Sequence, residues 1–212
     1  MSTAAERSAM TRTARWNRYW DGKSRNYDRE MRFMDRKLFG DSRAWVCGQA
    51  TGDVLEVAVG TGLNLPLYPD GVTLTGIDLS DGMLAIARDR AGRLGHPVTL
   101  RRADAHDLPF GADSFDTVVC TLGLCAIPED GMALREMARV LRPGGRLILL
   151  DHIASSSRPV RGLQWIAEKI TVPMAGEHFL RRPLDKIGGL GLTVERRERF
   201  NLGLVERLVA RK

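Results

Sequence analysis

Several features are missing from this 212-residue chain, and each absence narrows what the protein can be. No apolar run approaches the ~20 residues that a membrane-spanning helix needs. The first residues, MSTAAER, lack the apolar segment of a secretory signal peptide. Cysteine is scarce, since Cys47, Cys120 and Cys125 are odd in number and lack the spacing of a metal site. We therefore expect a cytoplasmic protein without a bound metal.

Acidic residues are too few to balance the basic ones, and the net charge of +6 is unevenly distributed. Residues 1–45 hold 11 Lys or Arg against 6 Asp or Glu, and residues 180–212 hold 9 against 4, whereas residues 46–179 hold 12 against 16. Basic ends suit peripheral association with an anionic membrane, and ordinary solvated arginine faces are the alternative. The chain shows no basic–aromatic platform of a nucleic-acid module, so we do not expect nucleic acid as a partner.

The stretch V-L-E-V-A-V-G-T-G-L-N, residues 54–64, lacks the third glycine of a dinucleotide fingerprint, because Leu65 stands in its place. What remains is an apolar strand, a glycine turn and the start of a short helix. Glycine lets the backbone approach a ligand closely, and a helix N-terminus offers unpaired N–H groups. The stretch predicts the opening unit of a nucleotide-binding α/β sheet. Its expected ligand-binding positions are Glu56, Gly60, Thr61, Gly62 and Asn64.

Acidic residues follow the next two predicted strands. The strand T-L-T-G-I-D ends on Asp78, where a carboxylate can accept hydrogen bonds from both hydroxyls of a ribose. The segment L-R-R-A-D-A places Asp104 just past a third strand, where it can accept a hydrogen bond from an adenine amino group. In doubly wound sheets ligands bind beyond the carboxyl ends of the strands, so these two carboxylates predict an adenosine site.

Five segments in a fixed order resemble the class I S-adenosylmethionine-dependent methyltransferases. They lie within residues 50–152 and read E-V-A-V-G-T-G, G-I-D-L-S, A-D-A-H-D-L-P-F, S-F-D-T-V-V-C and R-V-L-R-P-G-G-R-L. Ala58 departs from the pattern, because the family most often has glycine there, and we expect an altered ligand fit. The resemblance implies an α/β fold with a Rossmann-like, doubly wound sheet of seven strands. That sheet is mostly parallel, its last strand is antiparallel, and an N-terminal helical lid covers it.

The resemblance also implies the cofactor, S-adenosyl-L-methionine, with S-adenosyl-L-homocysteine as the product. In the family, the residues after the ribose-binding acid flank the adenine, and the residue after the adenine-binding acid offers its N–H. A tyrosine of a Tyr-Asp pair in the lid lies close to the cofactor. The end of the fourth strand is expected to meet the sulfonium and the acceptor. In this chain these positions are Leu79 and Met83, Ala105, Tyr27, and Thr121 and Leu122.

We divide the chain into an N-terminal helical lid, residues 1–48, and a methyltransferase domain, residues 49–212. An insertion on the acceptor side is expected at about residues 153–180. The lid is predicted to be helical from Thr13 to Leu38 with a break near Gly22. Its Trp, Tyr and Arg residues suit a membrane interface, and simple packing on the sheet is the alternative.

Methyl transfer from a sulfonium needs positioning more than activation, because the leaving group is already activated. The remaining task is to supply a deprotonated nucleophile. His152 lies directly beyond the fifth predicted strand and is the preferred base, because an unperturbed pKa of roughly 6.5 suits that role. A structural histidine bonded to a carbonyl is the alternative. Further candidates are Asp151, Glu177 and His178, although Glu177-His178 can also be a solvated loop. His106, in a polar loop, is expected to be merely solvated.

The segments C-T-L-G-L-C-A-I and D-H-I-A-S resemble three groups of small methyltransferases. These are the bacterial phosphatidylethanolamine N-methyltransferases, the animal methyltransferase-like thiol methyltransferases and the quinone C-methyltransferases. All three handle hydrophobic or amphipathic acceptors, so we expect a small-molecule or lipid acceptor that is methylated at N or S. Methylation at C or O of a quinone or natural product is the alternative. A nicotinamide-dependent oxidoreductase and a non-catalytic S-adenosylmethionine-binding protein are the alternatives from other classes.

Overall fold

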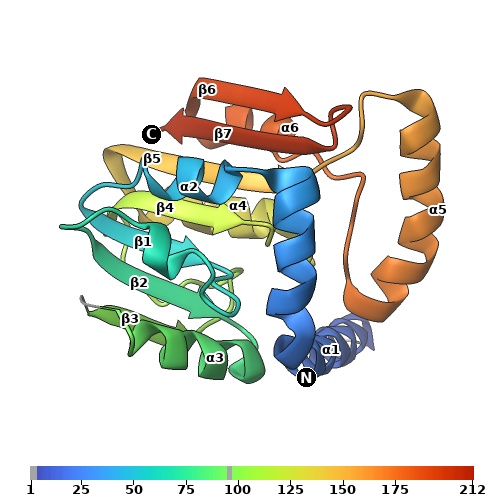
Figure 1. Ribbon diagram of the computed structural model, residues 1–212, viewed down its shortest axis with the longest axis horizontal. Helices are drawn as coiled ribbons and strands as arrows, with labels where there is room; N and C mark the ends of the chain where they lie inside the picture. The colour runs from blue at the N-terminus through green and yellow to red at the C-terminus, as the bar shows by residue number, and fades with distance from the viewer. Residues whose placement is uncertain (1–3, 95–96) are drawn as a thin grey trace.

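The computed structural model describes residues 4–94 and 97–212, and a seven-stranded sheet forms its centre (Figure 1). The strands are β1 (Asp53–Val57), β2 (Thr73–Asp78), β3 (Val98–Arg102), β4 (Phe115–Thr121), β5 (Leu141–His152), β6 (Thr193–Phe200) and β7 (Val205–Arg211). Their order across the sheet is β3-β2-β1-β4-β5-β7-β6. Strands β1 to β5 pair in parallel, whereas β7 runs antiparallel to β5 and β6. The predicted sheet, including the antiparallel last strand, is confirmed.

Helices cover both faces of the sheet. They are α1 (Ala4–Met34), the π-helix η1 (Asp35–Phe39), α2 (Ser42–Cys47), the 3₁₀ helix η2 (Leu65–Leu67), α3 (Asp81–Ala91), α4 (Asp130–Val140), α5 (Arg158–Ala175), α6 (Leu184–Ile187) and the 3₁₀ helix η3 (Gly188–Leu190). On one face, Leu134 of α4 and Ile187 of α6 are buried in the first core. On the other face, Val46 of α2 and Leu84 of α3 are buried in the second. Two cores are what a sheet with helices on both faces requires.

The central strands explain where the fold can bind a ligand. Parallel strands that are covered on both faces read as continuous apolar runs, and Val54, Leu55, Val118 and Val119 are fully buried. The strand order reverses between β1 and β4, because β1 leads back to β2 and β4 leads on to β5. A doubly wound sheet opens a crevice at the carboxyl ends of its strands at such a point.

The long helix α1 lies over the start of α3 and is held there by Asp21. The Asp21 carboxylate accepts hydrogen bonds from Ser80 Oγ at 2.5 Å and from the Gly82 backbone N–H at 3.0 Å. The helix passes through Gly22 without interruption, so the predicted break is wrong. Glycine costs a helix about 1 kcal/mol relative to alanine. The tertiary contacts of Asp21 outweigh that cost.

Helix α5 stands at the far end of the molecule, away from most of the sheet (Figure 1). The buried Gln164 side chain joins it to the end of β5, because it accepts from Ser155 N–H at 2.8 Å and donates to Ile153 O at 2.9 Å. At the C-terminal end of α5, the Ala175 carbonyl accepts a hydrogen bond from Trp20 Nε1 of α1 at 3.2 Å. Within residues 4–94 and 97–212, no helix has both the length and the apolar character that crossing a membrane demands.

Candidate active site

A pocket lies between α1 and the carboxyl ends of the central strands. Most of the predicted cofactor contacts line it, namely Tyr27, Glu56, Gly60, Thr61, Asp78, Leu79, Met83, Asp104, Ala105, Thr121 and Leu122. Gly62 and Asn64 are the two predicted contacts outside the lining. Gly62 adopts a φ of +77°, and a Cβ there would lie 2.7 Å from the Leu65 side chain. Gly62 therefore shapes the turn that carries Gly60 and Thr61.

Asp78 is positioned by two backbone donors. Its Oδ2 accepts from Gly60 N–H at 2.9 Å, and its Oδ1 accepts from Ser80 N–H at 2.8 Å. Burial raises the pKa of Asp78, and these backbone hydrogen bonds oppose the increase. Each carboxylate oxygen keeps further acceptor capacity, so the group can receive two ribose hydroxyls.

Ala58 shows how the chain accommodates its departure from the family pattern. Its φ of 57° lies in the left-handed region, which glycine favours and alanine rarely adopts. Gly123 packs against it, and a Cβ at Gly123 would lie 2.7 Å from Ala58 Cβ. Both residues line the pocket. The extra methyl group of Ala58 is therefore matched by a missing side chain at Gly123.

A buried polar network lies behind the glycine turn. Glu56 accepts hydrogen bonds from Asn64 Nδ2 at 2.7 Å and from the Tyr68 hydroxyl at 3.0 Å. Burial raises the pKa of Glu56 to about 7, although both hydrogen bonds and the nearby Arg43 lower it. Asn64 thus holds the carboxylate of Glu56, which lines the pocket.

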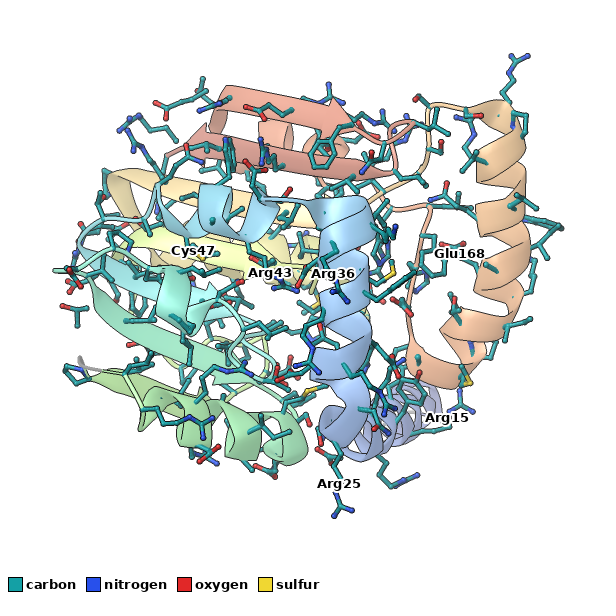
Figure 2. The ribbon with its side chains drawn as sticks, viewed as in Figure 1. Arg15, Arg25, Arg36, Arg43, Cys47 and Glu168 are labelled. Atoms are coloured by element: carbon teal, nitrogen blue, oxygen red, sulfur yellow. The ribbon has the colours of Figure 1, made fainter. Side chains whose placement is uncertain are left out.

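Arg43 of α2 completes this network, although it was not among the residues predicted from the sequence. Its Nη1 donates to Asn64 Oδ1 at 3.0 Å, and its Nε donates to Asp35 Oδ1 at 3.0 Å. Arg43 lines the pocket and points inward from α2 (Figure 2), and its buried Nη2 has no hydrogen-bond partner among the described residues. An unpaired guanidinium N–H group at a pocket wall fits a carboxylate. The amino-acid end of S-adenosylmethionine carries such a group.

His106 orients the second predicted carboxylate. Its Nδ1 lies 2.7 Å from Asp104 Oδ1, and its Nε2 accepts from Glu129 N–H at 3.2 Å. The ring is therefore held at both nitrogens, by Asp104 on one side and by the start of α4 on the other. The hydrogen bond from His106 lowers the pKa of Asp104 and keeps its carboxylate ionised. The solvated role expected for His106 is wrong, because its side chain holds Asp104 at the pocket wall.

The Tyr-Asp pair of α1 joins the lid to the glycine turn. Asp28 accepts from Thr61 Oγ1 at 2.6 Å and pairs with Arg90 at 2.5 Å. Arg90 also donates to the Thr61 carbonyl at 2.7 Å. Tyr27 faces the pocket and meets the edge of Trp20, with ring centroids 6.3 Å apart. Burial raises the pKa of the Tyr27 hydroxyl, which therefore stays neutral.

The predicted catalytic residues lie outside the lining of this pocket, next to the loop that follows β4. Asp151 is buried and accepts from the backbone N–H groups of Cys125 at 3.0 Å and His152 at 2.8 Å. His178 donates its backbone N–H to the Cys125 carbonyl at 2.9 Å, and its ring lies 3.9 Å from Glu168. Asp151 and the His178 backbone thus hold the Cys125 segment in place.

His152 and Glu177 form a partly enclosed pair. His152 Nε2 lies 3.5 Å from Glu177 Oε1, while Nδ1 is buried without a partner among the described residues. Burial lowers the pKa of His152, but the contact with Glu177 and the nearby Asp151 outweigh it, so the pKa is raised. Phe179 lies against the ring at 4.8 Å between centroids. The pair is suited to accepting a proton.

Cys125 joins this pair to form a cluster whose candidate ligand atoms lie within 4.8 Å of one another. The combination of Cys, His and Glu resembles a metal-ligand set, and only a thiolate would bind a metal. Burial raises the pKa of the Cys125 thiol well above its ordinary value. Burial therefore favours the neutral thiol of Cys125 beside His152 and Glu177.

Residues 55–149 match the family model described as a methyltransferase domain. This segment, a little less than half of the chain, is similar to a methyltransferase domain. The matched segment contains the glycine turn and both carboxylates that are predicted to bind adenosine. The family and the fold imply S-adenosyl-L-methionine as the cofactor, and the lining of the pocket fits it. This finding favours methyl transfer over nicotinamide-dependent oxidoreduction.

Curated relatives that match the chain methylate different atoms. The chain is 45% identical over 115 residues to a phosphatidylethanolamine N-methyltransferase of Cereibacter sphaeroides, covering 53% of this chain and 57% of the relative. It is 35% identical to a ubiquinone/menaquinone biosynthesis C-methyltransferase of Geobacter sulfurreducens, covering 59% and 55%. It is 34% identical to a thiol S-methyltransferase of Homo sapiens, covering 61% and 54%. The chain thus spans about half the length of the curated relatives it matches.

A solved structure is similar in fold to most of the chain. A Thermotoga maritima protein described as an S-adenosylmethionine-dependent methyltransferase aligns with a TM-score of 0.67 at 22% identity. The alignment covers 92% of this chain and 99% of that protein. At this identity the likeness shows the fold, so the acceptor must be argued from the site itself.

Proposed function

We propose that this protein transfers a methyl group from S-adenosylmethionine to a nitrogen or sulfur of a small amphipathic acceptor. The observation that carries the proposal is a single pocket with Asp78 and Asp104 on the sheet side and the rings of Trp16, Trp20 and Tyr27 on the lid side. Electron-rich aromatic faces attract cations, so they favour a sulfonium and a methylated ammonium alike.

The cofactor supplies a methyl group on an activated sulfur, and the chain must present a nucleophile in line with it. A protonated amine has no lone pair for this displacement and must first lose a proton. His152 is the proposed base, because its Nδ1 is unpaired among the described residues and Glu177 stands next to Nε2 to stabilise the imidazolium. In the proposed reaction the amine proton moves to His152, the nitrogen–methyl bond forms, and the sulfur–methyl bond breaks.

Nitrogen is favoured over carbon as the methylated atom by two observations. The relative with 45% identity is named for N-methylation of a phospholipid amine. The proton-accepting cluster of His152 and Glu177 is needed for an ammonium and much less for a thiol, whose pKa of roughly 8.5 leaves some thiolate at neutral pH. Transfer to sulfur is the second candidate, and C- or O-methylation of a quinone or natural product is the alternative.

An acceptor of the lipid type is found at membranes, and we propose peripheral association of this protein with an anionic membrane. In support of this proposal, the described side chains of α1 include the exposed cations Arg15 and Arg25 (Figure 2). Arg29 of the same helix is also exposed. Anionic lipid headgroups attract such basic segments by about 1 kcal/mol for each Lys or Arg near the surface. The helix α1 is proposed to act at the same time as a lid over the cofactor.

The proposal is tested by mass spectrometry of an acceptor panel. The protein is incubated with S-adenosylmethionine that carries a deuterated methyl group, together with an aminolipid, an alkyl thiol and a quinol of similar apolar size. We expect gain of one labelled methyl group on the amine or the thiol. The Asp78→Ala variant is the control, because it should lose turnover on every acceptor. Methyl gain on the quinol alone would show that the carbon alternative is correct.

A further inference from the structure

The outer face of α5 is apolar and uncovered. Leu163 is 67% exposed, Ile166 56% and Ile170 65%. They follow one another at helical spacing, so they form a continuous stripe along several turns. Trp165 and Met174 flank the stripe and are also exposed. Scattered apolar residues are normal on a protein surface, but a contiguous patch marks an interaction site.

The exposed stripe is not the side through which α5 packs on the rest of the protein. The opposite side of α5 already has its partners, because Gln164 is buried and bonds to Ile153 O and Phe179 O. Ala175 is buried at the C-terminal end, where its carbonyl accepts from Trp20. The helix therefore docks on the protein through one side and leaves the other available.

The charges around the stripe are positive. Lys169 Nζ lies 4.6 Å from the centroid of the Trp165 ring, on the exposed side of the helix. Arg158, in the first turn of α5, is also exposed. The only carboxylate within α5 belongs to Glu168, which faces the rest of the molecule (Figure 2) and accepts from the N–H groups of Phe179 and Leu180. Negative charge is thereby kept away from the exposed face.

We propose that the outer face of α5 docks on an anionic lipid bilayer, with Leu163, Ile166 and Ile170 in the interface. A helix that lies in a membrane interface buries an apolar face and places Lys and Arg among the anionic headgroups. Charge complementarity decides between the two simplest occupants. A second copy of this chain would bring two basic faces together, whereas an anionic bilayer neutralises them.

Docking at α5 orients the pocket toward the bilayer. The C-terminal end of α5 touches the lid, since Trp20 bonds to Ala175 O and the ring of Trp16 packs against Gly176. Both tryptophans also line the cofactor pocket. An acceptor drawn from the bilayer would thus enter beside α5 and α1. This inference rests on the proposed lipid-type acceptor, and it assigns the contact to α5 in addition to the basic residues of α1.

The test is co-sedimentation of the full chain with two kinds of vesicles, phosphatidylcholine alone and phosphatidylcholine mixed with phosphatidylglycerol. The test variant is L163S/I166S/I170S, and the control M132S/V194S/L202S replaces three exposed apolar residues on other elements. We expect binding to the anionic vesicles that weakens with added salt. The test variant should bind at least about tenfold more weakly, because the lost apolar burial is worth well over 1.4 kcal/mol. The control should bind like the unmodified chain.

Two outcomes would overturn the inference, and a parallel turnover measurement separates it from the proposed function. Equal binding by the test variant and the control would remove α5 as the contact. Sedimentation velocity without vesicles that shows a dimer, lost in the test variant, would assign the stripe to a second copy. Turnover of a short-chain, water-soluble amine without vesicles is measured in parallel. If that turnover persists in L163S/I166S/I170S while vesicle binding is lost, the docking face and the methyl transfer are separate properties.

Discussion

The backbone N–H of Gly60 donates a hydrogen bond to the carboxylate of Asp78, with 2.9 Å between the two heavy atoms. This contact joins the glycine turn after β1 to the carboxyl end of β2, the neighbouring strand in the sheet. One backbone donor therefore positions both the turn and the acid that are expected to hold the cofactor.

Replacing Asp78 should weaken cofactor binding without unfolding the protein. Asp78→Ala removes the acceptor of two ribose hydroxyls, each contributing roughly 1.5–3 kcal/mol as a charge-assisted bond. Calorimetry with S-adenosyl-L-homocysteine should show at least a tenfold loss of affinity. The thermal midpoint of the variant without ligand checks that the fold persists. An unchanged affinity would show that Asp78 does not hold the ribose.

Arg43 should discriminate between ligands by their carboxylate. Its Nη2, which has no partner within residues 4–94 and 97–212, is expected to bind the amino-acid end of the cofactor. Arg43→Met should therefore weaken S-adenosylmethionine binding by roughly tenfold or more. The matched ligand is 5′-methylthioadenosine, which has the same adenosine but no carboxylate. Its affinity should hardly change. Equal losses for both ligands would mean that Arg43 only supports Asn64 and the surrounding network.

The pH dependence of amine methylation should follow His152. A base must be neutral, and the pKa of His152 is raised by Glu177 and Asp151 against the lowering effect of burial. The rate with an amine should therefore rise with pH through this raised value. Glu177→Gln removes one stabilising charge from the imidazolium, so the rise should move to lower pH. Pre-steady-state or steady-state kinetics across pH 6 to 9 would measure the shift.

Replacing His152 itself tests whether it is the base. His152→Ala should slow transfer to an amine by roughly 10²–10⁴-fold and transfer to a thiol much less. The raised pKa of His152 also makes the stability of the fold depend on pH. The favourable contact of the His152 imidazolium with Glu177 and Asp151 is fully present below the unfolded pKa of ~6.5, and it is lost as the pH rises through the pKa in the folded protein. Full activity of His152→Ala on amines across pH 6 to 9 would show that His152 is a structural residue and not the base.

Two glycine substitutions test the contact between the lid and α5. Gly176 has a φ of +73°, and an added Cβ would lie 2.7 Å from the Trp16 ring, so Gly176→Ala should destabilise the fold by about 1–3 kcal/mol. Gly162, within α5, has nothing within 4 Å of the same added atom. Gly162→Ala should therefore be neutral or stabilising by up to about 1 kcal/mol. Equal thermal midpoints for the two variants would argue against a packed lid.

The fold and the convergence of Asp78 and Asp104 on one pocket could be predicted because their determinants are local. The segment S-F-D-T-V-V-C, one of the five that resemble the family, supplies β4 (Phe115–Thr121), since a continuous apolar run must be covered on both faces. Asp78 and Asp104 were predicted from their positions just after strands, and the parallel sheet brings those ends together.

The rest depends on contacts between distant segments, which a single sequence does not reveal. Arg43 has a role because α2 packs beside Asn64 and the π-helix that carries Asp35. His106 is held because Glu129, at the start of α4, offers its N–H to the ring. The exposed face of α5 is likewise a tertiary result, because apolar residues at helical spacing usually indicate a core face.

The most direct test of the assigned pocket is a crystal structure of the full chain with S-adenosyl-L-homocysteine. We predict the ribose hydroxyls within hydrogen-bond distance of the Asp78 carboxylate, the adenine amino group at Asp104 and the ligand carboxylate at Arg43 Nη2. A ligand bound with its ribose away from Asp78, or bound outside the space between α1 and the carboxyl ends of β1, β2 and β4, would contradict the assignment.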